Sequence, residues 1–225
     1  MSTFLVELVK LMARVLYNTL LPDIQIYAGK CPTPIILNQL RQVARDFYRI
    51  SQGYVYTLDA TDVEAGQTEI FPSLPDQTEL LVPLNLTCEG TSAPLVTTTV
   101  AQANAMYGNW RTSTGTPGFV MRTTSESLSL VPLPSNSISE GLMGTVALVP
   151  TRAATGVEKE ILERDGDYLV HGTLARLLAM TGTEWFAPNN VGFHEGRYQV
   201  GIVLAKEAAM QTDTPQYITT GYGGL

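Results

Sequence analysis

Cysteine and histidine are scarce in this 225-residue sequence, which therefore holds few of the residues that build metal and redox sites. Cys31 and Cys88 lie far apart and form no CxxC pair, and neither His171 nor His194 is followed by a ligand-type residue at position i+4. This pattern argues against a zinc site and against a disulfide framework. We therefore expect no metal and no cofactor, and we interpret both histidines as surface or interface residues.

Motifs for covalent and nucleotide chemistry are missing as well. The sequence has no GxSxG elbow, no GxxxxGK[ST] phosphate loop and no GxGxxG fingerprint. It therefore indicates a protein that is not an enzyme. A hydrolase that uses His171 or His194 together with a carboxylate is the less favoured alternative.

Charge is sparse and unevenly spread. Charged residues make up 16% of the chain, and the net charge is −7. Residues 1–51 carry six basic and three acidic side chains, whereas residues 52–157 carry three basic and nine acidic ones. Tight binding of nucleic-acid phosphates needs an excess of Lys and Arg, so the acidic middle region argues against specific DNA binding.

No stretch is apolar for long enough to cross a bilayer. The most apolar one, MSTFLVELVKLMARVLYNTLL, is interrupted by Glu7, Lys10 and Arg14, whereas a spanning helix needs about 20 residues almost without charge. We expect no membrane contact, and an amphipathic helix that ends near Leu20 because Pro22 follows. The apolar face of this helix would comprise Phe4, Leu8, Leu11, Met12, Val15 and Leu16.

Three further segments have apolar residues at helical spacing. They cover about residues 34–51, 157–180 and 190–210. Gly172 lies inside the second of these segments, and we expect it to permit the close approach of a neighbouring helix. The helical segments therefore come from both ends of the chain.

The first of these three segments also carries a basic stripe. Arg41, Arg45 and Arg49 follow one another at intervals of four residues and share one helix face. The stripe is either a solvated helix face or a subunit contact with an acidic neighbour.

Between residues 52 and 157 the pattern changes to short alternating runs separated by Gly- and Pro-containing turns. Pro83 lies inside one run and indicates an edge strand or a bulge. The candidate strands are residues 54–59, 68–71, 80–88, 95–101, 118–123, 128–131 and 142–149.

These segments predict an α+β fold. A helical bundle would be built from residues 1–51 and 158–210, and an antiparallel β-sandwich or barrel-like domain of residues 52–157 would be inserted between them. Residues 211–225 would form an extended C-terminal tail. This tail is either a floppy end or a segment that orders on a neighbour, with Tyr217, Ile218 and Tyr222 as its anchors.

Taken together, this layout resembles the head–tail adaptor (connector) proteins of tailed bacteriophages. Four stretches carry the resemblance, in the order of the family and over most of the chain, although each is mainly a packing pattern. They are CPTPIILNQLRQVARDFYRIS (31–51), GTPGFVMRTTSESLSLVPLPS (115–135), LVHGTLARLLAM (169–180) and WFAPNNVGFHEGRYQVGIVLAKEAA (185–209).

The resemblance implies a structural virion protein. Such adaptors form a ring, commonly of twelve copies, that joins the portal protein to the next tail component (nozzle, tube or stopper) and leaves a channel for DNA. It implies that the protein is assembled in the host cytoplasm, that it lies in the neck of the virion, and that residues 211–225 dock on the portal. We further expect part of the acidic strand region to face the channel or the tail end, where it would repel phosphates.

A second kind of function remains open from the residues alone. The β-rich region could hold a ligand such as a glycan, which would need exposed aromatic side chains on one face. Tyr54, Tyr56 and Trp110 are the candidates.

Overall fold

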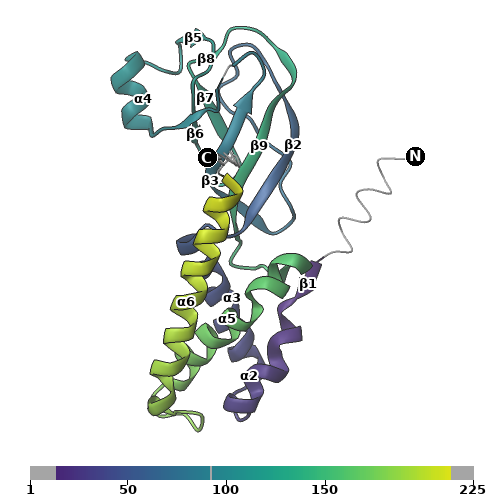
Figure 1. Cartoon of the computed structure of the whole chain (residues 1–225), viewed down its shortest axis with the longest axis vertical. Coiled ribbons are helices and arrows are strands. Elements are labelled where there is room, and N and C mark those ends of the chain that lie inside the picture. The colour runs from purple at the N-terminus through teal and green to yellow at the C-terminus, as the bar shows by residue number, and fades with distance from the viewer. Residues whose placement is uncertain (1–13, 92, 214–225) are drawn as a thin grey trace, which may run out of the picture.

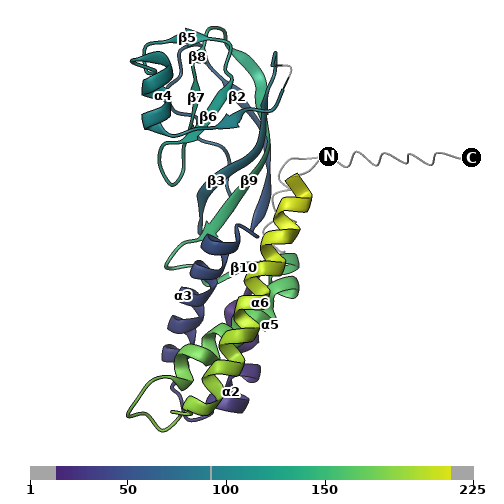
Figure 2. The same ribbon diagram turned by 60° about the vertical axis from the view of Figure 1, so that its left-hand side comes forward.

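The computed structural model describes residues 14–91 and 93–213 as an elongated, mixed α/β molecule. Helices drawn from both ends of the chain lie together at one end, and most strands lie at the other (Figure 1). Figure 2 shows the same division after rotation, with the strands β3 and β9 leading from the helical end into the β-rich end. No helix in the described ranges is long and apolar enough to span a membrane.

The helical end is built from four α-helices. They are α2 (Leu21–Ala28), α3 (Thr33–Ser51), α5 (Lys159–Leu178) and α6 (Pro188–Asp213). Helix α5 lies between the others and packs against α2, α3 and α6, while α3 also touches α6 directly. The three segments predicted at helical spacing are thus helices, and α6 runs three residues beyond the expected end at residue 210.

The prediction of one helix up to Leu20 is wrong for the described part of that segment. Residues Arg14–Leu16 form the strand β1, which pairs with β10 (Gly156–Glu158), and Tyr17–Leu20 form a short 3₁₀ helix, η1. Pro22 does not end a helix. It stands in the first turn of α2, where the missing N–H of proline removes no helical hydrogen bond.

Glycines allow the three long helices to approach closely. A Cβ at Gly172 of α5 would lie 2.7 Å from Cε2 of Tyr198 on α6 and 2.8 Å from Cγ1 of Val43 on α3. A Cβ at Gly201 of α6 would overlap the Cγ of Tyr168 on α5. The interpretation of Gly172 as a close-approach position is therefore confirmed.

The main sheet of the β-rich end has three antiparallel strands in the order β2 (Val55–Val63), β9 (Ile138–Pro150) and β3 (Thr78–Cys88). Pro83 lies in the edge strand β3, beside a register shift between Pro83 and Asn85, as expected. The chain between β3 and β9 forms smaller sheets. Strand β6 (Phe119–Arg122) lies between β4 (Val96–Thr97) and β7 (Leu128–Val131), and β5 (Thr114–Gly115) pairs with β8 (Leu133–Pro134).

Several details of the β-rich end differ from expectation. The pairs β4–β6 and β5–β8 are parallel, so the described strands are not purely antiparallel. The expected strand at 68–71 is reduced to a single bridge between Ile70 and Leu128. The expected strand at 95–101 shrinks to β4 and is followed by the helix α4 (Val100–Tyr107), which a capping box of Thr99 and Gln102 begins.

One apolar core continues from the helical end into the β-rich end. It includes Leu40 and Phe47 of α3, Leu174 of α5, Leu86 of β3 and Val146 of β9. This core crosses both expected boundaries, at 51/52 and 157/158, and so the two ends form one packed body. A smaller core lies under α4 and contains Ala103, Trp110, Met121, Val131 and Leu133.

Candidate functional site

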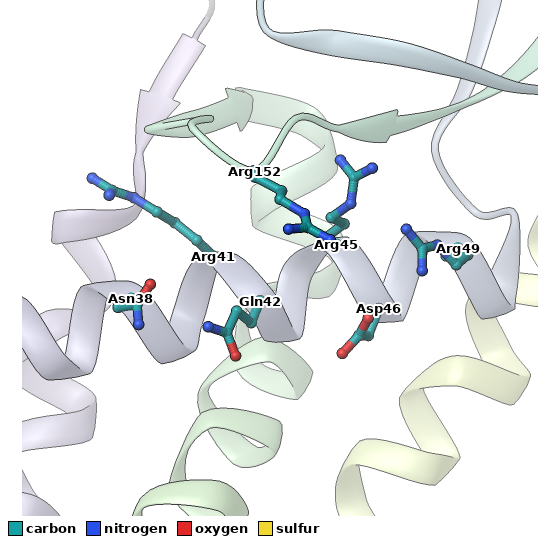
Figure 3. A pocket seen from close by; sticks show the side chains of 7 residues that line it. All are labelled: Asn38, Arg41, Gln42, Arg45, Asp46, Arg49 and Arg152. Atoms are coloured by element: carbon teal, nitrogen blue, oxygen red, sulfur yellow. The ribbon is translucent and has the colours of Figure 1, made fainter. Parts of the chain in front are cut away.

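The predicted basic stripe lines a hollow of about 370 Å³ on the outer side of α3. Figure 3 shows Arg41, Arg45 and Arg49 projecting from α3, and Arg152 approaching them from the loop after β9. We call this surface the arginine groove. Its remaining lining residues are Asn38, Gln42 and Asp46.

The position of the groove follows from the amphipathic pattern of α3. The buried face of the helix carries residues such as Leu40, Val43 and Phe47, which are fully excluded from solvent. The arginines occupy another face. Since each residue advances a helix by about 1.5 Å, Arg41 and Arg49 begin about 12 Å apart along the axis.

Arg45 is engaged within the molecule. Its Nη1 donates to Oε1 of Glu79 at 3.1 Å and its Nη2 to Oε2 at 2.8 Å, while Nη1 also donates to the carbonyl oxygen of Pro150 at 2.7 Å. The hydrogen bonds from Arg45 lower the pKa of Glu79 below its ordinary value. This forked pair joins α3 to β3 and β9, so Arg45 holds the helical end on the main sheet.

The other three arginines of the groove have no hydrogen-bonded acidic partner in the described part of the chain. Neither Arg41, Arg49 nor Arg152 forms an ion pair or side-chain hydrogen bond within residues 14–91 and 93–213. The Nε atom of Arg41 is buried and has no hydrogen-bond partner. The single acidic lining residue, Asp46, already accepts a hydrogen bond from Nη2 of Arg176 at 2.7 Å.

The groove therefore concentrates positive charge on an otherwise acidic protein. Guanidinium groups bind carboxylate or phosphate oxygens through paired, planar hydrogen bonds, and they are more weakly hydrated than ammonium groups. The arrangement suits recognition of oxyanionic groups on a partner.

Helix α6 presents a second exposed surface, which is apolar and which the sequence interpretation missed. Phe193 is 60% exposed and Val203 is 54% exposed, although both belong to a helix that packs on α5 through Tyr198. We call four of these exposed apolar positions the α6 stripe. It comprises Phe193, Val200, Val203 and Leu204. The intervals of three, four and seven residues between these positions were the available signal.

The two histidines lie together between α5 and α6. The Nδ1 atoms of His171 and His194 are 2.8 Å apart, so one ring donates a hydrogen bond and the other accepts it. The ring of Tyr27 lies edge-on to His194, which is 2% exposed. Burial lowers the pKa of both histidines. The interpretation of His194 as a surface residue is therefore wrong, since it is an interior residue of the helical end.

The aromatic residues proposed for ligand binding do not gather on an exposed face. Trp110 is buried in the smaller core, Tyr54 is buried with its hydroxyl donating to Glu158, and Tyr56 is half-buried against the main core. The three proposed anchors of the tail, Tyr217, Ile218 and Tyr222, lie outside the described residues.

Comparison with known proteins gives no independent assignment of function. No protein-family model matches the sequence, and no curated protein is significantly similar to it.

Proposed function

We propose that this protein is a ring-forming structural adaptor of a tailed-phage virion, which joins the portal protein to the next tail component and leaves a channel for DNA. In this proposal the helices from both ends of the chain form the bundle that makes the ring, and residues 52–157 form the inserted β domain. The ring would contain about twelve copies. It would lie in the virion neck after assembly in the host cytoplasm.

The observation that carries the proposal is the presence of two unlike, exposed faces on one elongated subunit. The arginine groove on α3 is charged, and the α6 stripe is apolar. Because α3 and α6 contact each other and α5 through their buried sides, the two faces look outward in different directions. Unlike faces on one subunit favour head-to-tail contacts, which generate a ring when the rotation closes.

The charge distribution supports a passive channel. Residues 52–157 carry nine acidic and three basic side chains, and these acidic groups would repel DNA phosphates during passage. We assign the acidic β-rich end to the channel or tail side of the ring. Residues 211–225 would dock on the portal, with Tyr217, Ile218 and Tyr222 as anchors.

Cryo-electron microscopy of the particles of the phage that encodes the protein tests the proposal. We expect a ring of density between head and tail into which the helical end fits with its long axis near the channel axis. Mass spectrometry of purified particles should find about twelve copies for each portal ring. A protein absent from the particle, or spread over the capsid shell, would refute the proposed function.

A further inference from the structure

We propose that the arginine groove of one copy receives the carboxylates of α5 of a neighbouring copy, so that the ring closes through an α3–α5 charge contact. This inference rests on the proposed function, because it names the contact that would hold adjacent subunits of the ring together. The hydrogen-bond donors of this contact would be Arg41, Arg49 and Arg152 of one copy. The carboxylates that accept would be Glu160, Glu163 and Asp167 of the neighbouring copy.

The carboxylates of α5 are available for a contact with another molecule. Glu160, Glu163 and Asp167 are all exposed and lie at intervals of three and four residues, which places them on one side of the helix. Glu163 has an exposed ion pair with Lys159 at 3.5 Å. Such solvated pairs on a helix contribute little and exchange easily for a better partner. The neighbouring Arg164 is occupied, since it bonds Asp165 and the carbonyl oxygen of Gly53.

The two charged surfaces match in length. Arg41 and Arg49 are eight residues apart on α3, which corresponds to about 12 Å along the helix axis. Glu160 and Asp167 are seven residues apart on α5, which corresponds to about 10.5 Å. Two helices packed side by side could therefore bring the arginines of one copy opposite the carboxylates of the other.

The geometry favours a contact between copies over one within a copy. Helices α3 and α5 pack against each other where Val43 of α3 meets Gly172 of α5, so the exposed sides of the two helices point away from each other. The arginines and the carboxylates lie on these exposed faces. A repeated contact of this kind uses two different patches of each subunit, as a closed ring requires.

An acidic protein surface fits the groove better than a nucleic acid does. A protein surface that binds nucleic acid usually carries an extended row of basic side chains, which neutralises many phosphates. Here the unmatched positive charge is confined to one helix face and Arg152, and Asp46 lies within it. The neighbouring β-rich end is acidic and would repel the rest of a duplex.

Charge reversal in the full-length chain tests the contact. A phage that lacks the gene is supplied with variants from a plasmid, and both infectivity and the copies per particle are measured. We expect Arg49→Glu with Arg152→Glu to reduce both at least about tenfold, because like charges would then face each other. Glu160→Arg with Glu163→Arg should do the same. The combination of all four changes should restore at least about half of the incorporation.

A matched control changes charge away from the proposed contact. Lys206→Glu with Lys30→Glu alters the net charge as much as the groove variant does, on exposed residues of α6 and of the turn after α2. It should incorporate normally. Arg45 stays unchanged in every variant, so the hydrogen bonds from α3 to Glu79 are preserved. Thermal unfolding of each purified variant shows whether that variant is folded.

The outcomes separate the inference from the proposed function. The α3–α5 contact is overturned if the groove variant is incorporated normally. It is also overturned if the variant with all four substitutions does not restore incorporation. Either result leaves the proposed function intact, because the wild-type protein is still found in the particle. Absence of the wild-type chain from particles overturns the proposed function itself. Fluorescence anisotropy with a short labelled DNA duplex tests whether the groove binds DNA instead. Micromolar binding that disappears in the groove variant would assign the groove to DNA and overturn the α3–α5 contact.

Discussion

The close packing of α5 and α6 predicts opposite effects for the same substitution at two glycines of one helix. Gly201 and Gly196 both lie inside α6. Alanine stabilises an exposed helix interior by about 1 kcal/mol relative to glycine. A Cβ at Gly196 meets nothing within 4 Å, whereas a Cβ at Gly201 would overlap Cγ of Tyr168 and lie 2.6 Å from its Cδ1.

The structure sets the size of the difference. Tyr168 cannot yield cheaply at Gly201, because the overlapping atoms are those nearest its own backbone rather than the far end of its ring. Forcing an extra carbon into such a contact costs about 1–3 kcal/mol. Gly196→Ala should therefore stabilise the protein by up to about 1 kcal/mol. Gly201→Ala should be about 1–3 kcal/mol less stable than Gly196→Ala, because the gain in helix propensity is common to both variants.

Urea unfolding followed by circular dichroism measures the two free energies of unfolding directly. The slope of the free energy of unfolding against urea concentration (the m value) should be the same in both variants. An unchanged slope would show that the variants differ in native-state stability and not in the surface exposed on unfolding. If Gly201→Ala unfolds at the same urea concentration as Gly196→Ala or at a higher one, the argument for close packing of α5 on α6 fails.

Three further predictions concern other contacts. Arg45→Ala should lower the free energy of unfolding by about 1–2 kcal/mol, because it leaves the half-buried Glu79 without its forked partner. In a double-mutant cycle, adding Glu79→Ala to Arg45→Ala should lower the free energy of unfolding little further, because the two residues stabilise the fold through the same contact. The buried pair His171–His194 binds protons less readily than free histidine, so the unfolded chain takes up protons first as the pH falls through the ordinary pKa of 6.5. The melting temperature should therefore fall with pH just below that value, and the fall should be smaller in His171→Asn. Trp110→Ala should remove about 3–5 kcal/mol from the smaller core, which tryptophan fluorescence and calorimetry would detect.

The strongest periodic patterns gave the most accurate predictions of structure. The predicted helix at 34–51 differs from α3 by one residue, and the predicted strand at 128–131 matches β7. In both segments, the intrinsic preference of the residues and the pattern of buried side chains favour the same secondary structure. The prediction for residues 14–20 failed because β1 is determined by its partner, with Arg14 opposite Glu158, and no local pattern reveals a pairing across so much of the chain. The sequence left residues 101–116 open between a short helix and a long loop, and α4 shows that a short helix begins there, with the capping box at Thr99 as its signal.

The candidate site could be predicted only where it lies on one element. The regular spacing of Arg41, Arg45 and Arg49 was sufficient to place these residues on a single face of α3. The addition of Arg152, about a hundred residues later, depends on where the chain leaves β9, which periodicity does not show. The different roles of the arginines also depend on tertiary contacts, since Arg45 is the member of the stripe that donates hydrogen bonds to Glu79 in the described structure.

The pairing of α6 with α3 also has a consequence for synthesis of the chain. The hydroxyl of Tyr198 reaches the carbonyl oxygen of Val43, which was made 155 residues earlier, and Gly53 contacts Ala205. While the chain is still on the ribosome, the part of α3 that contacts α6 stays uncovered until this last helix emerges. A prematurely terminated chain would keep that side open to chaperones and proteases. Only full-length copies would then be available for assembly.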